Sequence, residues 1–170
     1  TICVKENMDI RSGESHILPI HATSSFSYRN IEDSMDVFEG KKEGFVYSRY
    51  GNPTIDSVQN KLALLESLDI EDDAFCIMTA SGLAAISTLC ISLLNPGDAI
   101  LTQETLYGGS TELLRKLMEK YGVHVIVANL DDPTAIKMHL ESEKNIKLIY
   151  FETPTNPTLS CIDIKQISEL

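Results

Sequence analysis

The sequence lacks the long apolar run that a membrane-spanning helix requires, since no hydrophobic stretch reaches about 18 consecutive residues. Nothing in it has the pattern of a secretory signal, a basic leader followed by an apolar segment. Basic residues are few, with 14 Lys and Arg against 25 Asp and Glu, and the net charge is −11. This balance argues against nucleic acid or an anionic membrane as the partner.

Cysteine and histidine are also scarce, with four of each, and neither type is clustered. No cysteine pair has the spacing of a zinc site, and the histidines form no metal-ligand motif. We therefore expect no metal site, and we expect reduced thiols in a cytoplasmic protein. The residues concerned are Cys3, Cys76, Cys90, Cys161, His16, His21, His124 and His139.

The segment 74–95 predicts a strand that turns directly into a buried helix. Phe75–Thr79 is a short apolar run, and Leu83–Leu94 is apolar nearly all round. The small residues of 80–82 let the backbone turn between them. The unpaired amides at the start of such a helix form an anion site suited to a phosphate. The alternative is a small-residue turn that serves packing alone.

The rest of the chain alternates between strand and helix patterns, after an irregular N-terminal region that contains a short helix. With the strand at 75–79, the alternation predicts four strands in a mostly parallel α/β sheet with helices on both faces. Thr54 is the expected N-cap of an amphipathic helix. The expected elements are helices at Ile31–Phe38, Ile55–Leu68, Leu113–Tyr121 (with Leu113, Leu114, Leu117, Met118 and Tyr121 inward) and Pro133–Ser142, and strands at Ala99–Thr102, Val123–Ala128 and Ile146–Phe151.

Three segments of unusual composition follow predicted strands: 81–82, 107–110 and 152–156. Because the carboxyl ends of parallel strands meet at one edge of a sheet, we expect these segments to form a cofactor pocket. Arg49, beside Tyr47, is suited to bidentate phosphate binding in its own subunit or a neighbouring one. The alternative is a surface arginine next to a packed tyrosine.

Four motifs in register give the chain a family resemblance. They are Tyr-Ser-Arg-x-x-Asn-Pro-Thr at 47–54, Ala-Ser-Gly-Leu-Ala-Ala-Ile at 80–86, Leu-Tyr-Gly-Gly-Ser at 106–110 and Phe-Glu-Thr-Pro-x-Asn-Pro at 151–157. The chain resembles the Cys/Met-metabolism pyridoxal-phosphate enzymes, which include cystathionine γ-synthase, cystathionine lyases, methionine γ-lyase and O-acetylhomoserine sulfhydrylase. The resemblance implies the fold of type I pyridoxal-phosphate enzymes and a homotetramer built as a dimer of dimers.

The resemblance also implies a role for each motif residue. The hydroxyl of Ser81 and the amides of Gly82 and Leu83 would hold the cofactor phosphate. Tyr47 and Arg49 would reach that phosphate from the adjacent subunit.

The remaining implied roles lie nearer the reacting atoms. Tyr107 would stack on the pyridine ring and shuttle protons. Asn156 would bind the phenolic oxygen of the ring and face the substrate carboxylate, and Glu152 would brace this loop.

The residues also indicate what this stretch of chain lacks. It begins without methionine and ends inside the amphipathic pattern Asp163–Leu170, so we interpret it as a fragment of a longer protein. In the family, the Schiff-base lysine and the acid that binds the pyridine nitrogen lie downstream of Asn156, and no lysine here matches that motif. We expect the fragment alone to be inactive. We further expect an arm at 1–53 that serves the neighbouring subunit's site, and the first part of the cofactor-binding domain at 54–170.

The leading hypothesis is a pyridoxal-phosphate-dependent enzyme of sulfur amino-acid metabolism that catalyses γ-replacement or β/γ-elimination. A non-catalytic phosphate-ligand-binding or assembly subunit of the same fold is the alternative. An unrelated nucleotide-binding domain is disfavoured, since the chain has neither a G-x-G-x-x-G nor a G-K-[ST] loop.

Overall fold

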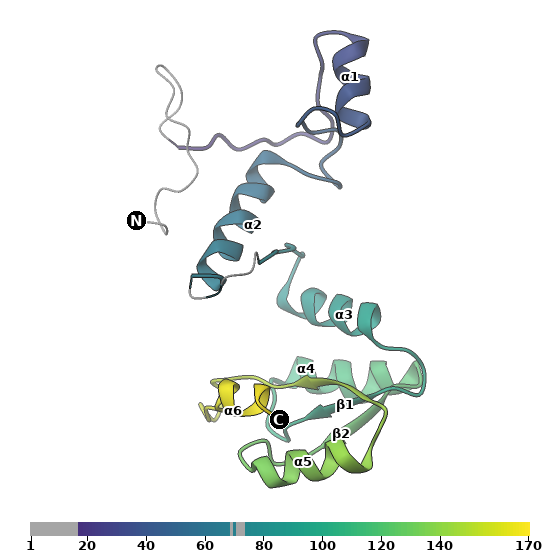
Figure 1. Cartoon of the computed structure of the whole chain (residues 1–170), viewed down its shortest axis with the longest axis vertical. Coiled ribbons are helices and arrows are strands. Elements are labelled where there is room, and N and C mark those ends of the chain that lie inside the picture. Colours follow the sequence, from purple (N-terminus) through teal and green to yellow (C-terminus); the bar gives the residue numbers. More distant parts are fainter. Residues whose placement is uncertain (1–16, 69, 71–73) are drawn as a thin grey trace. The chain divides into compact units, whose positions relative to one another are not determined.

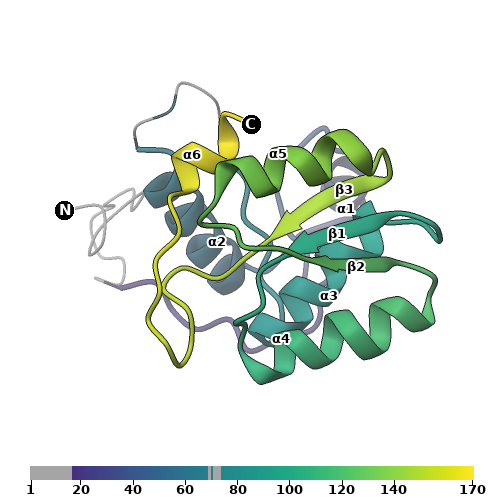
Figure 2. The ribbon, with the colours of Figure 1, turned by 90° about the horizontal axis from the view of Figure 1, so that it is seen from below.

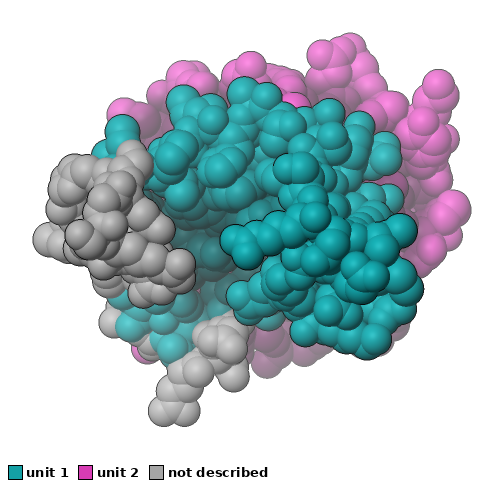
Figure 3. Space-filling view, turned by 90° about the horizontal axis from the view of Figure 1, so that it is seen from above, with its two compact units in different colours: residues 1–78 teal, residues 79–170 magenta. Residues whose placement is uncertain are grey.

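The computed structural model describes residues 17–68, 70 and 74–170, so Cys3 and His16 lie outside the described residues (Figure 1). The chain divides into two compact units, residues 1–78 and 79–170 (Figure 3). The predicted division into an arm at 1–53 and a domain at 54–170 stays a prediction. The elements are α1 Ile31–Phe38, α2 Pro53–Glu66, α3 Gly82–Leu93, β1 Ala99–Thr102, α4 Gly108–Glu112, the π-helix η1 Leu113–Met118, β2 His124–Val127, α5 Pro133–Ser142, β3 Ile146–Tyr150 and α6 Ile164–Ser168.

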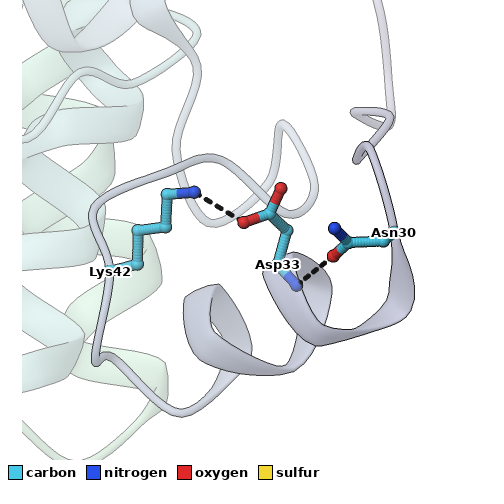
Figure 4. A network of polar contacts seen from close by, with 3 residues as sticks. All are labelled: Asn30, Asp33 and Lys42. Carbon is cyan, nitrogen blue, oxygen red and sulfur yellow. Dashed lines mark hydrogen bonds and ion pairs between the residues drawn. The ribbon is translucent and has the colours of Figure 1, made fainter.

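Helix α1 of the first unit has the predicted bounds and a side-chain cap at its start. The Asn30 side-chain oxygen accepts a hydrogen bond from the Asp33 amide at 2.7 Å. The Lys42 ammonium lies 2.7 Å from the Asp33 carboxylate (Figure 4). The hydrogen bond from Lys42 lowers the pKa of Asp33. These contacts attach the loop after α1 to the first turn of the helix.

The predicted cap of α2 is wrong by two positions. The helix starts at Pro53, and Asn52 is its N-cap, with its side-chain oxygen accepting from the Thr54 amide at 2.9 Å. Proline suits the first helical position because its fixed φ is helical and it has no amide hydrogen to leave unpaired. The helix ends at Glu66, so Leu68 lies outside it.

The second unit contains the predicted parallel sheet, with strand order β2-β1-β3. Strand β1 pairs in parallel with both neighbours, and Thr102 at its carboxyl end lies opposite Val127 and Tyr150. All four residues of β1 are buried. A central strand covered on both faces has a continuous apolar run, which residues 99–101 show, with the buried Thr102 at the end.

Helices cover both faces of this sheet, as predicted (Figure 2). Ile100 packs in one hydrophobic cluster with residues of α3 and η1, and Leu101 packs in a second cluster with residues of α5 and α6. Successive strand residues point to opposite faces, so β1 contributes to both cores. This arrangement directs the carboxyl ends of the strands, and the loops that follow them, to one edge.

Phe75–Thr79 was predicted as a fourth strand, and this prediction is wrong. The segment has no strand assignment, and Phe75 and Ile77 are 93% and 82% exposed. A strand forms only where a neighbour supplies hydrogen-bond partners. Among the described residues, the Met78 amide instead donates to the Gln59 side chain at 2.8 Å.

The helix predicted to follow a loop at 106–110 begins earlier, at Gly108, and differs from a regular α-helix. It changes to π-helical hydrogen bonding over Leu113–Met118, which alters the 3.6-residue spacing used for the prediction. Leu114 and Met118 are buried as expected, but Leu117 and Tyr121 are exposed. No helix in the described part of the chain is both long and apolar enough to span a membrane.

Candidate functional site

The start of α3 has the features of an anion site. Ser81 is extended, and its hydroxyl oxygen accepts a hydrogen bond from the Ala84 amide at 3.1 Å. That hydroxyl still has its own hydrogen to donate. The amides of Gly82 and Leu83 have no acceptor among the described residues. These three donors and the positive end of the helix dipole suit a phosphate.

Two further observations support this fit. Ser81, Gly82 and Leu83 are all exposed, and a Cβ built on Gly82 meets no atom within 4 Å. The first turn of α3 contains no acidic residue, whereas the first turns of α1 and α2 do. No carboxylate of the helix itself therefore competes with an incoming anion. The residues present fit the phosphate of a cofactor.

The loop that contains Tyr107 is fixed by a carboxylate from the end of β3. Glu152 Oε2 accepts from the Tyr107 amide at 2.8 Å, and Glu152 Oε1 accepts from the Ser110 hydroxyl at 2.7 Å. Glu152 and Tyr107 are 45 positions apart in the sequence. The parallel pairing of β1 with β3 brings them together, because both residues follow the carboxyl ends of these strands. The Tyr107 side chain itself is half exposed.

Tyr150, the last residue of β3, contributes a third donor to this carboxylate. Its hydroxyl lies 3.2 Å from Glu152 Oε1 and 3.4 Å from Ser110 Oγ. Burial raises the pKa of Tyr150, the Ser110 hydroxyl opposes this shift, and the negative Glu152 adds to it. The phenol is therefore protonated at neutral pH and donates its hydrogen.

The Tyr107 loop and the start of α3 are close neighbours. A Cβ built on Gly109 lies 2.7 Å from a ring carbon of Tyr107 and 3.1 Å from a methyl carbon of Leu83. Gly109 thus leaves the space that the Tyr107 ring and the Leu83 side chain occupy. The segment 107–110 therefore lies beside Leu83, the residue that follows the predicted segment 81–82, and the hydrogen bonds of Glu152 connect it to the segment 152–156.

Asn156 is less closely tied to these residues. It is exposed in the turn after β3, and no hydrogen bond of its side chain occurs among the described residues. The turn is organised by Thr155, which is 1% exposed. The Thr155 hydroxyl oxygen accepts from the Ser160 amide at 3.0 Å, and its backbone oxygen accepts from the Leu159 amide at 2.8 Å.

Tyr47 and Arg49 belong to the first unit. The guanidinium carbon of Arg49 lies 5.1 Å from the centre of the Tyr47 ring and 5.6 Å from that of Tyr50. Contacts of this kind are cation–π interactions. No carboxylate of the described residues forms an ion pair with Arg49. The exposed guanidinium keeps its hydrogen-bond donors available for an anion.

Ser110, Tyr150 and Thr155 are structural residues of the site with no individual role expected from the sequence. Ser110 and Thr155 are each 1% exposed, and they hold the loops that carry Tyr107 and Asn156. Ser110 and Thr155 lie within the predicted pocket segments 107–110 and 152–156, whereas Tyr150 was indicated only by its place at the end of a predicted strand. Their partners are set by the tertiary structure.

The sequence model of the Cys/Met metabolism PLP-dependent enzyme family matches residues 1–170. The chain belongs to this family. Pyridoxal phosphate (PLP) is the cofactor of the family, and the unpaired donors at the start of α3 suit its phosphate.

Curated relatives include both lyases and sulfhydrylases. An L-methionine γ-lyase from Treponema denticola is 35% identical over 89% of this chain and 36% of its own length. An O-succinylhomoserine sulfhydrylase from Pseudomonas aeruginosa is 30% identical over 97% of this chain and 41% of its own length. The chain therefore spans about two fifths of the length of these relatives.

Solved structures confirm the fold of PLP-dependent transsulfuration enzymes. A putative O-acetylhomoserine (thiol)-lyase from Campylobacter jejuni, solved with a pyridoxyl-lysine phosphate group, superimposes with a TM-score of 0.82. It is 27% identical, and the match covers 99% of this chain and 39% of that one. A cystathionine γ-lyase from Lactobacillus plantarum, complexed with L-serine, gives a TM-score of 0.74 at 32% identity over 89% of this chain and 35% of that one.

Alanine at Gly109 is expected to displace the Tyr107 ring, because the new Cβ overlaps the position of that ring. In the full-length protein, we expect Gly109→Ala to lower kcat about tenfold or more, since small misplacements of a reacting group are costly. Gly108→Ala is the matched control, because a Cβ at Gly108 meets nothing within 4 Å. Steady-state kinetics of the two variants test this, and equal kcat values for both would contradict it.

Proposed function

We propose that the protein containing this chain is a PLP-dependent enzyme of sulfur amino-acid metabolism. It catalyses γ-replacement on O-acyl-homoserine, as in cystathionine synthesis or sulfhydrylation, or β/γ-elimination from sulfur amino acids. The observation that carries this proposal is the contact between the start of α3 and the Tyr107 loop, made within a chain of this family. The named relatives include both a lyase and a sulfhydrylase, which supports this reaction class without separating its members.

The residues of this chain bind the cofactor and orient it. Ser81 donates its hydroxyl hydrogen to the phosphate, and Gly82 and Leu83 donate their amides. When bound, PLP withdraws electrons from the α-carbon of an amino-acid substrate.

The other motif residues act around this phosphate. Tyr107 covers the ring and transfers protons at its hydroxyl oxygen. Asn156 donates an amide hydrogen to the phenolic oxygen of the ring, and Glu152 orients the Tyr107 loop. Tyr47 and Arg49 bind the same phosphate from a neighbouring subunit, so the complete site exists only in a homo-oligomer, with a dimer of dimers as its form.

The proposal also includes a location and partners for the enzyme. Cys76, Cys90 and Cys161 are free thiols among the described residues, in keeping with a reducing, cytoplasmic location. The substrate is a small amino acid, and neither nucleic acid nor a membrane takes part.

A spectroscopic experiment tests the proposed function. The full-length protein, purified and incubated with PLP, is expected to absorb visible light in the band of the protein-bound cofactor and to lose this band on borohydride treatment. A protein that stays colourless with added PLP contradicts the proposal. A protein that binds PLP but converts neither O-acyl-homoserine, cystathionine nor methionine indicates the non-catalytic alternative.

A further inference from the structure

The carboxylate of Glu152 is occupied by donors of the protein itself. Oε2 accepts from the Tyr107 amide, and Oε1 accepts from the hydroxyls of Ser110 and Tyr150, at 2.8, 2.7 and 3.2 Å. Ser110 is 1% exposed, and Tyr150 and Glu152 are half-buried. A carboxylate with its oxygens engaged in this way acts on the loop that it holds and has little capacity left for a ligand.

These donors connect two separate elements of the fold. Tyr107 is the residue immediately before α4, and its own side chain does not cap the helix. The carboxylate of Glu152 accepts from the Tyr107 amide and thus binds the backbone at the start of α4. Ser110 lies in the first turn of α4, and Tyr150 ends β3. A negative group is favourable at this position because the start of a helix carries partial positive charge.

The backbone beside Glu152 is anchored as well. The Thr102 hydroxyl donates to the backbone oxygen of Tyr150 at 2.7 Å, and the Gln103 side-chain amide lies 3.4 Å from the backbone oxygen of Glu152. Both anchors come from the end of β1. The Glu152 side chain therefore starts from an anchored backbone, and the three donors to its oxygens set the position and rotation of the carboxylate group.

We propose that Ser110 and Tyr150 are positioning residues that hold the Glu152 carboxylate in the orientation that fixes Tyr107 for proton transfer. This inference rests on the proposed function, because it concerns Tyr107 as the group next to the reacting atoms. The two hydroxyls on Oε1 set the rotation of the carboxylate, and this rotation directs Oε2 at the Tyr107 amide. Without them, the carboxylate turns and the start of α4 loses its acceptor.

Hydrogen exchange resolved to the Tyr107 amide, in the full-length protein without PLP, tests the positioning directly. We expect Glu152→Ala to accelerate exchange of this amide about tenfold or more, since a hydrogen bond to a charged acceptor is lost. Ser110→Ala and Tyr150→Phe should accelerate it less. Glu152→Gln keeps an oxygen acceptor for the amide, so it should stay close to the wild type.

Steady-state kinetics of the same variants test the consequence for catalysis. We expect kcat to fall about 100-fold in Glu152→Ala with KM changed less than about threefold, because the misplaced group acts in the transition state. Glu152→Gln should recover most of this loss. Ser110→Ala should lower kcat in the wild-type background but not in Glu152→Ala, since both act through one carboxylate.

Glu112→Gln is the matched control, because it removes a carboxylate of helix α4 whose one ion pair among the described residues is with Lys116 at the surface. The inference is overturned if the Tyr107 amide in Glu152→Ala exchanges at the wild-type rate. It is also overturned if Ser110→Ala and Tyr150→Phe have the same kcat as Glu112→Gln. If Glu152→Ala does not fold, the two hydroxyl deletions decide the question, because each removes a single oxygen atom. The exchange measurement needs no PLP, so its outcome is separate from a failure of the proposed function.

Discussion

Arg49→Ala is expected to weaken PLP binding to the full-length protein roughly 10- to 150-fold, because a hydrogen bond to a charged group contributes about 1.5–3 kcal/mol. The guanidinium forms no ion pair among the described residues, and the rings of Tyr47 and Tyr50 flank it. Its donors are therefore available to a phosphate. The measurement is the dissociation constant of PLP, by titration of the visible absorbance.

Arg49→Lys separates charge from geometry in this experiment. Lysine keeps the positive charge but cannot bind two phosphate oxygens with a planar group, so an intermediate dissociation constant is expected. Arg29→Ala is the control, because it removes an arginine near Asp33 on the same unit. If Arg49→Ala binds PLP as tightly as Arg29→Ala does, Arg49 does not hold the phosphate.

Tyr107→Phe is expected to lower kcat about 100-fold or more, since a positioned proton-transfer group contributes typically 10²–10⁴-fold. Affinity for PLP should change far less, because phenylalanine keeps the ring that covers the cofactor. The Tyr107 amide would keep its bond to Glu152, so the loop should retain its position. Steady-state kinetics and PLP titration of the variant measure the two effects.

Tyr121→Phe provides the matched control for this prediction. Tyr107 precedes the helix formed by α4 and η1, and Tyr121 follows its end. Tyr121 is exposed and makes no side-chain hydrogen bond among the described residues. Its replacement should leave kcat within about twofold, as surface changes have small effects. A Tyr107→Phe enzyme that keeps wild-type kcat would show that the phenol hydroxyl transfers no proton in the limiting step.

Local patterns in the sequence were sufficient for most of the elements. The bounds of α1, β1 and α5 were predicted as observed, because caps, proline and apolar spacing act within a few residues. The parallel sheet and its two covered faces followed from the alternation of strands and helices. The family was predicted from four motifs in register, and the family match over 1–170 confirmed it.

Two of the wrong predictions have separate physical causes. Phe75–Thr79 has the composition of a strand, but a strand also requires a neighbouring strand to pair with. The sequence of a five-residue segment does not specify whether such a partner is present. The inward face after Glu112 was misplaced because the helix changes to π-helical bonding, which alters the spacing at Leu117, and because the helix ends before Tyr121, which lies in a turn.

The sequence alone determined which chemical groups this protein has for its site. They are the backbone amides without acceptors at the start of the helix after Ser81, a tyrosine in a glycine-rich loop and a carboxylate after a strand. Their contacts were decided by tertiary structure. The pairing register of β1 with β3 brings Glu152 to Tyr107 and Ser110 across 45 and 42 positions. Hydrogen bonds over such separations depend on how strands align in space, and no local pattern specifies that alignment.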